Sequence, residues 1–233
     1  DGLVWTFEMR DDVFWVNYDT EDGKAKKLEK VTADDVVYGV RRTINPETAS
    51  DYAYVNYIIK NAEAVNTGES TDMESVGVRA VDDFAVEFTL EQPAGYFPAI
   101  AGMWVNRPQP KDAIEEYGDK WTEPGNIVTN GPYCLDTWEH ENKMVFVANP
   151  HFYGYDDMDI TQVNCVMVTE ASTAFSMYEN GELDVAAPPL DDMDRVKADP
   201  TLSEELYIAP DLCTYYYGFN VTKAPFDNKL VRQ

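Results

Sequence analysis

Pairs of alternating apolar and polar segments, each pair joined by a short polar turn, restrict the folds open to the N-terminal part of the chain. Residues 75–90 (SVGVRAVDDFAVEFTL) alternate on both sides of Asp82-Asp83, and residues 126–148 alternate around a turn at 139–142. Neighbouring side chains of a β-strand point to opposite faces. Each pair therefore predicts a β-hairpin with one buried face.

Helices are expected between these hairpins. Residues 31–46 begin with Thr32 followed three residues later by Asp35, which is the spacing of a capping box, and Asn45-Pro46 ends the helix. The other expected elements are one or two strands over 3–16, a charged turn over 18–30, and helical segments over 48–68 and 110–121. Residues 96–110 are expected to form a short helix that runs into a proline-rich extended stretch.

The pattern changes after residue 148. Residues 160–189 read as an apolar strand, a helix ending at Gly181 and a short strand. This order predicts a βαβ unit with parallel strands. A helix over 190–199 and a last strand over 206–220 follow. The fold class is therefore α/β or α+β, with mixed sheets, hairpins and βαβ units, in at least two parts.

Three consecutive tyrosines in the stretch DLCTYYYGFN need a separate explanation. In a strand Tyr216 points to one face, and Tyr215 and Tyr217 point to the other. At least one of these rings must therefore face water, a partner or a ligand. Other aromatic residues stand in loop-like settings, where they serve either as core or as binding surface: Tyr52, Tyr54, Tyr96, Trp104 and Trp121.

Charge and composition exclude several classes of function. The net charge of −25 argues against nucleic acid and against an anionic membrane surface as partners. No stretch reaches the roughly 18 apolar residues of a membrane span. The chain opens without an initiator methionine or signal peptide, and it closes on FDNKLVRQ, which reads as the first turn of a helix. We therefore expect a segment of a longer protein.

The sequence contains no motif for catalysis, a metal or a cofactor. Nucleophile elbows, phosphate loops and dinucleotide fingerprints are absent. The two histidines and the three cysteines at 134, 165 and 213 do not cluster, so we expect neither a metal site nor a cofactor. The odd number of cysteines leaves open buried free thiols or one cysteine with a partner elsewhere.

Seven blocks in order carry a resemblance to a known family. They are FEMRDDVFW, VTADDVVYGVRRTINPETAS, VRAVDDFAVEFTL, DKWTEPGNIVTNGPYCLDTW, ANPHFY, YENGELDV and LCTYYYGFNVTKAPFDNKLVRQ. Together they span nearly the whole chain, which resembles the family 5 extracellular solute-binding proteins of ABC importers, in particular the oligopeptide-binding branch.

The resemblance implies a bilobal clam-shell fold of the periplasmic-binding-protein type II. Residues 1–131 would be most of a smaller inserted lobe, and residues 132–233 part of the first large lobe. The remainder of that lobe and a third lobe would lie outside this chain. The implied location is extracytoplasmic, either in the periplasm or as a cell-surface lipoprotein.

The resemblance also implies ligand-binding residues. Tyr52 and Tyr216 match tyrosines of the peptide cleft, and Cys213 matches a cysteine that can bridge to the third lobe. Four cleft positions depart from the family, because each lacks a polar group that the family commonly has there: Met103, Ala187, Pro188 and Gly218. A carboxylate lost at Gly218 should shift preference away from basic peptide side chains.

The implied function is a non-enzymatic receptor that binds oligopeptides and delivers them to the transmembrane subunits of an ABC permease. Three alternatives remain open from the residues. The same fold could carry a dipeptide, an oligosaccharide or a nickel complex. The two histidines of the chain provide few ligands for direct nickel coordination. The chain could also be a hydrolase that uses two of its many carboxylates, or a chaperone-like interaction protein.

Overall fold

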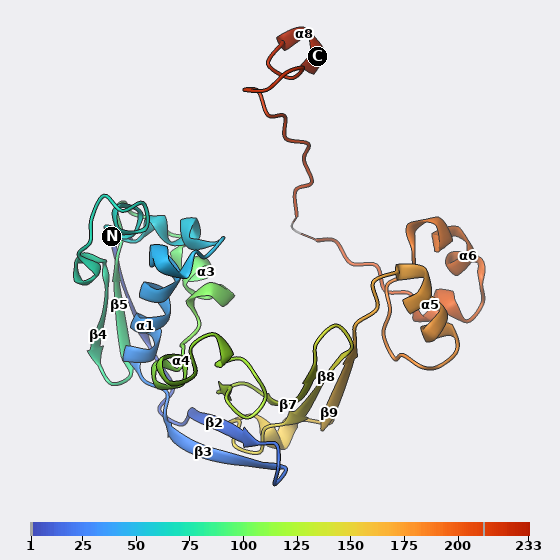
Figure 1. Cartoon of the computed structure of the whole chain (residues 1–233), viewed down its shortest axis with the longest axis horizontal. Coiled ribbons are helices and arrows are strands. Elements are labelled where there is room, and N and C mark those ends of the chain that lie inside the picture. The colour runs from blue at the N-terminus through green and yellow to red at the C-terminus, as the bar shows by residue number, and fades with distance from the viewer. Residues whose placement is uncertain (1, 212) are drawn as a thin grey trace. The chain divides into compact units, whose positions relative to one another are not determined.

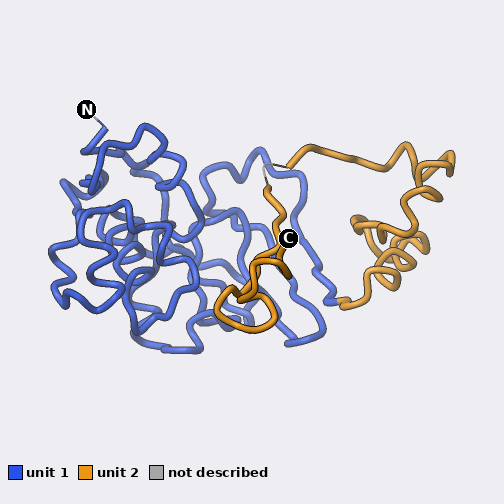
Figure 2. Tube along the Cα trace, turned by 90° about the horizontal axis from the view of Figure 1, so that it is seen from above, with its two compact units in different colours: residues 1–167 blue, residues 168–233 orange. Residues whose placement is uncertain are grey.

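The computed structural model describes residues 2–211 and 213–233, which form two compact units (Figures 1 and 2). Unit 1 runs to Met167, and unit 2 begins at Val168. The lobe boundary at residue 131 that the resemblance implies stays a prediction, since it concerns the lobes of the family rather than these units.

The first sheet of unit 1 forms around one of the expected hairpins. Its strand order is β1 (Val4–Glu8), β5 (Ala85–Thr89), β4 (Val78–Asp82), and all pairs are antiparallel. The hairpin turn is fixed where the Phe84 amide donates to the Asp82 side chain at 2.8 Å. The hairpin predicted at 75–90 is confirmed.

The second sheet has the order β3 (Lys24–Lys30), β2 (Phe14–Asp19), β6 (Val128–Thr129). The charged turn predicted over 18–30 is therefore wrong, because half of that segment is strand β3. Charged side chains suit an edge strand with solvent on one face. The Lys27 ammonium group makes a cation–π contact, 3.4 Å from the centre of the Phe14 ring.

The third sheet contains the other expected hairpin and corrects the predicted βαβ unit. Strands β7 (Tyr133–Glu139) and β8 (Lys143–Ala148) pair across the expected turn, and β9 (Gln162–Val166) pairs with β8 in the antiparallel sense. Among the described residues, 180–189 contain no strand and every strand pair is antiparallel. The βαβ unit and the mixed sheets are therefore not formed, because the 149–161 connection returns the chain beside β8.

Helix α1 (Ala33–Ile44) is the longest helix, and its predicted start is confirmed. The Thr32 amide donates to the Asp35 carboxylate at 2.7 Å, closing the capping box. The remaining helices are α2 (Ala62–Asn66), α3 (Phe97–Ala101), α4 (Lys111–Tyr117), α5 (Ala171–Glu179), α6 (Met193–Ala198), α7 (Leu202–Glu205) and α8 (Lys229–Arg232). None of the helices in the described residues has the length and apolar character of a membrane-spanning segment.

The helix predicted over 48–68 is broken into two pieces. The 3₁₀ segment η2 (Ala53–Ile58) is followed by α2. Asn61 between them has a φ of +60°, a left-handed conformation that an α-helix cannot contain.

The core of unit 1 lies between the first sheet and helices α1, α2 and α3. Phe97, Ile44, Ile59 and Val40 are fully buried in it. Unit 2 is different, because Phe175 and Val196 are the buried apolar side chains among its described residues. Most of its large apolar side chains are exposed.

The strand predicted over 206–220 is not formed in the described part of that segment. Residues 206–211 and 213–220 have no strand partner. A strand makes no hydrogen bonds of its own, so the alternating pattern produces a sheet only where a second strand pairs with it. The Tyr215 and Tyr217 rings nevertheless lie 5.6 Å apart, edge to face.

Candidate functional site

Three exposed aromatic side chains of unit 1 form a cluster around Tyr52, a residue predicted to bind ligand, whose ring contacts the other two. The Tyr52 ring lies 4.8 Å from the Trp104 ring at 71° and 6.1 Å from the Tyr54 ring at 25°. All three are exposed, with Trp104 at 55%. We call Tyr52, Tyr54 and Trp104 the aromatic cluster. Exposed aromatic faces with polar edges are suited to ligand contact.

Buried amides fix the backbone under this cluster. Tyr52 precedes η2, and Trp104 begins the 3₁₀ turn η4 (Trp104–Asn106). Asn56 of η2 donates from Nδ2 to Asn106 Oδ1 at 2.8 Å, and Asn106 Nδ2 donates to the Ile100 carbonyl at 2.9 Å. Both asparagines are buried. This pair joins the two turns that carry Tyr52 and Trp104.

Met103, the residue before η4, lines an apolar cavity of about 390 Å³, which we call the Met103 cavity. Its walls come from the first sheet, α1 and α3, and they include Phe7, Met9 and Phe88. Methionine side chains adapt to irregular apolar surfaces. The two predicted site residues of unit 1 thus precede two different turns, Tyr52 before η2 and Met103 before η4, and the Asn56–Asn106 hydrogen bond joins these turns.

Ala187 and Pro188 lie together in unit 2 and line a cavity of about 340 Å³. Phe175, Tyr178 and Tyr207 contribute its aromatic wall. The cavity is formed by α5, the loop after it, and helices α6 and α7 with the residues that follow α7.

The predicted site residues of the extended segment are exposed. Tyr216 is 80% exposed, and Cys213 is an exposed free thiol. A Cβ built on Gly218 meets the Tyr216 ring at 3.8 Å, which is ordinary contact. A side chain at position 218 would therefore fit beside Tyr216, so the glycine is not required by crowding.

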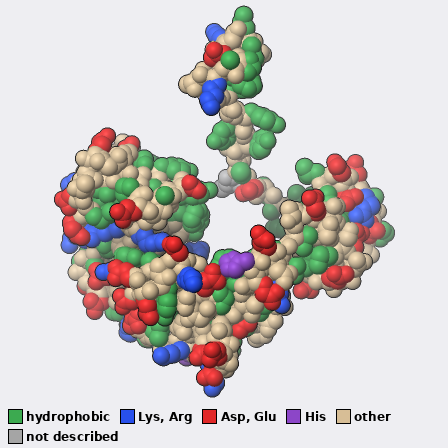
Figure 3. Space-filling view, viewed as in Figure 1, with side chains coloured by type: hydrophobic (Ala, Val, Ile, Leu, Met, Phe, Trp, Pro, Cys, Tyr) green, Lys and Arg blue, Asp and Glu red, His purple; other side chains and the backbone are tan. Residues whose placement is uncertain are grey.

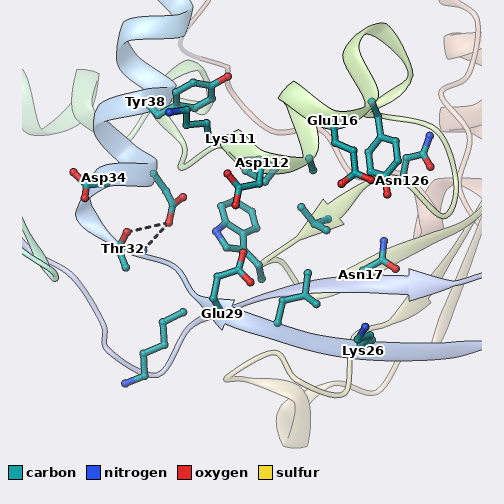
Figure 4. Close-up of a pocket in the computed structure, with 18 of the residues that line it drawn as sticks. Asn17, Lys26, Glu29, Thr32, Asp34, Tyr38, Lys111, Asp112, Glu116 and Asn126 are labelled. Atoms are coloured by element: carbon teal, nitrogen blue, oxygen red, sulfur yellow. Dashed lines mark hydrogen bonds between the residues drawn. The ribbon is translucent and has the colours of Figure 1, made fainter. Parts of the chain in front are cut away.

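A larger cavity that the sequence did not indicate lies elsewhere in unit 1 (Figure 4). It measures about 800 Å³ and lies between the β2–β3 ribbon and helices α1 and α4. Its charged lining residues are Lys26, Glu29, Lys30, Asp34, Asp35, Asp83, Lys111, Asp112 and Glu116. We call it the charged cavity. These residues come from four separate segments, so no single sequence motif marks it.

Asp35 is the half-buried carboxylate in the wall of the charged cavity. Burial raises the pKa of this carboxyl group, and hydrogen bonds from Thr32 and Trp15 partly oppose the rise. The Asp35 carboxylate thus accepts hydrogen bonds from the amide and the hydroxyl of Thr32 in the capping box.

The cysteines differ sharply in environment. Cys134 is buried in β7, whereas Cys165 and Cys213 are exposed. Burial raises the pKa of the Cys134 thiol to about 11. Within residues 2–211 and 213–233, no three His, Cys, Asp or Glu side chains come together as a possible metal site.

We expect alkylation with iodoacetamide at pH 8 to modify Cys165 and Cys213 quickly and Cys134 slowly. The thiolate is the reactive form, and a raised pKa leaves less of it at pH 8 than at an ordinary cysteine. Cys134 labelling should therefore rise as the pH increases towards 11. Peptide mass mapping of the three sites measures the rates, and labelling in urea is the control. Equal rates at all three cysteines in the folded protein would contradict the buried position.

The surface charge is dispersed. In the view of Figure 3, acidic side chains are scattered over both units, in keeping with the net charge of −25. The ion pairs are mostly exposed, such as Arg10–Asp12 at 2.7 Å, and contribute little stability.

A family model described as bacterial extracellular solute-binding proteins, family 5 Middle, matches residues 1–233. The chain belongs to this family. The family resemblance found in the sequence blocks is thereby confirmed, and so is the fold class at the level of a mixed α/β protein of the periplasmic-binding type.

Relatives in the family have named ligands. The chain is 36% identical over 236 residues to the periplasmic oligopeptide-binding protein OppA of Escherichia coli, covering 100% of this chain and 41% of the relative. It is 33% identical to the probable deoxycholate-binding periplasmic protein YgiS of the same organism, with the same coverage. The solved structure of the Escherichia coli murein tripeptide binding protein MppA matches with a TM-score of 0.88 and 30% identity, over 100% of this chain and 43% of that one.

The family 5 chain described here thus spans less than half the length of the relatives that it matches. These relatives are named as binding proteins, not as enzymes.

Proposed function

We propose that the chain is part of an extracytoplasmic receptor that binds oligopeptides and delivers them to the permease of an ABC importer. The observation that carries this proposal is the match of the family model over all 233 residues, together with 36% identity to an oligopeptide-binding relative. We propose binding without chemistry, and a location in the periplasm or on the cell surface through a lipid anchor.

Tyr52 of unit 1 and Tyr216 of unit 2 are each proposed as a peptide contact. Tyr52 offers an exposed ring and hydroxyl, and Tyr216 is freely exposed on an extended segment. A tyrosine can contact the main chain of a peptide without distinguishing its side chains. This suits a receptor that binds peptides of many sequences. Cys213 is proposed as a disulfide partner for a cysteine outside this chain.

We propose that the non-polar residues at the predicted ligand-binding positions set which peptide side chains the receptor prefers. Gly218, Ala187 and Pro188 carry no charge or side-chain hydrogen-bond donor, and Met103 faces an apolar cavity. An ammonium or guanidinium group buried in the Met103 cavity, whose lining among the described residues contains no carboxylate, would have no ionic partner there, which costs free energy. The receptor should therefore favour apolar over basic peptide side chains.

A second candidate function is the carriage of an apolar solute. A relative at 33% identity is named as a probable deoxycholate-binding protein. The Met103 cavity of about 390 Å³ is lined mainly by apolar side chains. Both observations suit a rigid apolar ligand with few polar groups.

Native mass spectrometry of the natural protein, purified without refolding, tests the proposal. Masses of short peptides that are released on mild denaturation and fragment into amino-acid residues would support the peptide function. A single added mass that does not fragment as a peptide would support the second candidate. Protein that carries no ligand and also fails to bind a random tetrapeptide library would overturn the peptide proposal.

A further inference from the structure

The charged cavity is separate from every residue assigned to the peptide site. Its walls are the β2–β3 ribbon, the start of α1 and one face of α4, all within unit 1. Tyr52, Met103 and Trp104 are not among its lining residues. With a volume of about 800 Å³ it is roughly twice the size of the Met103 cavity.

The base of the charged cavity is apolar. Trp15 lies there almost fully buried. Leu28, Phe84 and Val128 add further apolar surface. Such apolar side chains can contact the methylene groups of a small ligand.

The upper walls carry charges of both signs. Asp112 and Glu116 are four residues apart on α4, so both point from the same face of that helix. Lys26 and Glu29 project from β3 on the opposite wall (Figure 4). Asn17 and Asn126 add neutral hydrogen-bonding groups.

These opposite charges do not neutralise one another across the cavity. In the part of the chain that the structure describes, no lysine of the charged cavity lies within 4.0 Å of one of its carboxylates. Lys111, at the rim, contacts Glu115 outside the cavity at 3.8 Å. Ammonium and carboxylate groups that face each other over a cavity without pairing can each pair with a ligand of the opposite sign.

We propose that the charged cavity is a second binding site, for a small zwitterion that carries an ammonium and a carboxylate group separated by a short apolar spacer. The ammonium group pairs with Asp112 and Glu116 of α4. The carboxylate group pairs with Lys26 of β3, and the spacer lies over the half-buried apolar side chains of Leu28, Phe84 and Val128. Amino acids and short peptides share this chemistry.

Apolar or singly charged molecules fit the site less well. A cation alone leaves Lys26 unpaired, and an anion alone faces the surplus of carboxylates. A zwitterion satisfies both walls at once. Because the two walls do not touch, a spacer longer than that of glycine should bind better.

Titration of the natural protein, labelled with ¹⁵N in its tryptophans, tests the proposal by NMR. The probes are glycine, 4-aminobutyrate, 6-aminohexanoate and triglycine, with butylamine and butyrate as singly charged controls. Trp15 reports on the charged cavity and Trp104 on the aromatic cluster, each assigned from its Trp→Phe variant. We expect saturable shifts of the Trp15 indole with the longer zwitterions and much weaker shifts with the singly charged controls.

Two sets of variants test the walls separately. Lys26→Gln removes the partner of the carboxylate, and Asp112→Asn with Glu116→Gln removes the partners of the ammonium. Each set should weaken zwitterion binding about tenfold, the usual consequence of losing a charge-assisted hydrogen bond. The matched controls are Lys24→Gln on the same strand and Glu63→Gln on α2, which do not line the cavity and should leave binding unchanged.

The possible outcomes distinguish the proposed zwitterion site from the proposed peptide-binding function. Shifts of Trp15 that depend on both walls support the zwitterion site. Equal shifts with butylamine or butyrate, no Trp15 shift, or unchanged binding in both wall variants would overturn it. A shift of Trp104 alone would also overturn it, while leaving the proposed peptide receptor intact.

Discussion

Replacing Phe97 by alanine is expected to lower the free energy of unfolding of unit 1 by about 3–5 kcal/mol. The Phe97 side chain is fully buried at the start of α3, and its ring lies 5.2 Å from the Phe88 ring and 6.3 Å from the Phe7 ring. The change removes an aromatic side chain and leaves a cavity among strands that cannot close over it. Urea unfolding followed by far-UV circular dichroism measures the loss.

The neighbouring residue supplies a matched control. Tyr96 is 60% exposed, and no ring contact is recorded for it in the part of the chain that the structure describes. Tyr96→Ala should change the free energy of unfolding by less than about 0.5 kcal/mol. If Phe97→Ala cost no more than Tyr96→Ala, the described core between the first sheet and α3 would be wrong.

Local sequence signals predicted the elements whose hydrogen bonds are local. Thr32 and Asp35 mark the start of α1, and Asp82-Asp83 marks a hairpin, because capping and tight turns involve residues only a few positions apart. These predictions needed no knowledge of the rest of the chain.

Elements that depend on distant partners were less predictable. The lysines of residues 24–30 suggested a turn, yet β3 forms because β2 pairs with it. An apolar run does not indicate whether its neighbouring strand is parallel or antiparallel. The pattern over 160–189 therefore predicts a parallel unit, although β9 pairs with β8 in the antiparallel sense. The pattern at 206–220 predicted a strand, which does not form in the described residues without a second strand to pair with.

The candidate sites also combine features that the sequence predicts with features that depend on distant parts of the chain. The loop setting of Tyr52, Tyr54 and Trp104 was visible in the sequence, but their mutual contact depends on η2 and η4 lying side by side. The roles of Tyr52 and Met103 came from the family resemblance, and remain proposals. The charged cavity gave no sequence signal, because Lys26 and Glu116 are ninety residues apart and meet only through the fold.

Replacing Asn106 by alanine is the second change with a large expected effect, about 1–3 kcal/mol of unfolding free energy. Asn56 would keep a buried Nδ2 without its acceptor, and the Ile100 carbonyl would lose its donor. The turn that carries Trp104 would then lose its connection to η2. We expect the near-UV circular dichroism of the Trp104–Tyr52 contact to fall together with stability.

A double replacement separates the cost of an unpaired amide from the role of the pair. Asn56→Leu with Asn106→Leu removes both amides of the pair and leaves only the Ile100 carbonyl without its donor, and replacing both members of a hydrogen-bonded pair can be close to neutral for stability. We expect the double variant to recover most of the stability lost by Asn106→Ala without restoring the Trp104–Tyr52 signal. Recovery of both would show that apolar packing alone positions the aromatic cluster. Recovery of stability alone would mean that the buried asparagines fix the geometry of a site rather than the strength of a core, as expected where polar groups are retained to specify one arrangement.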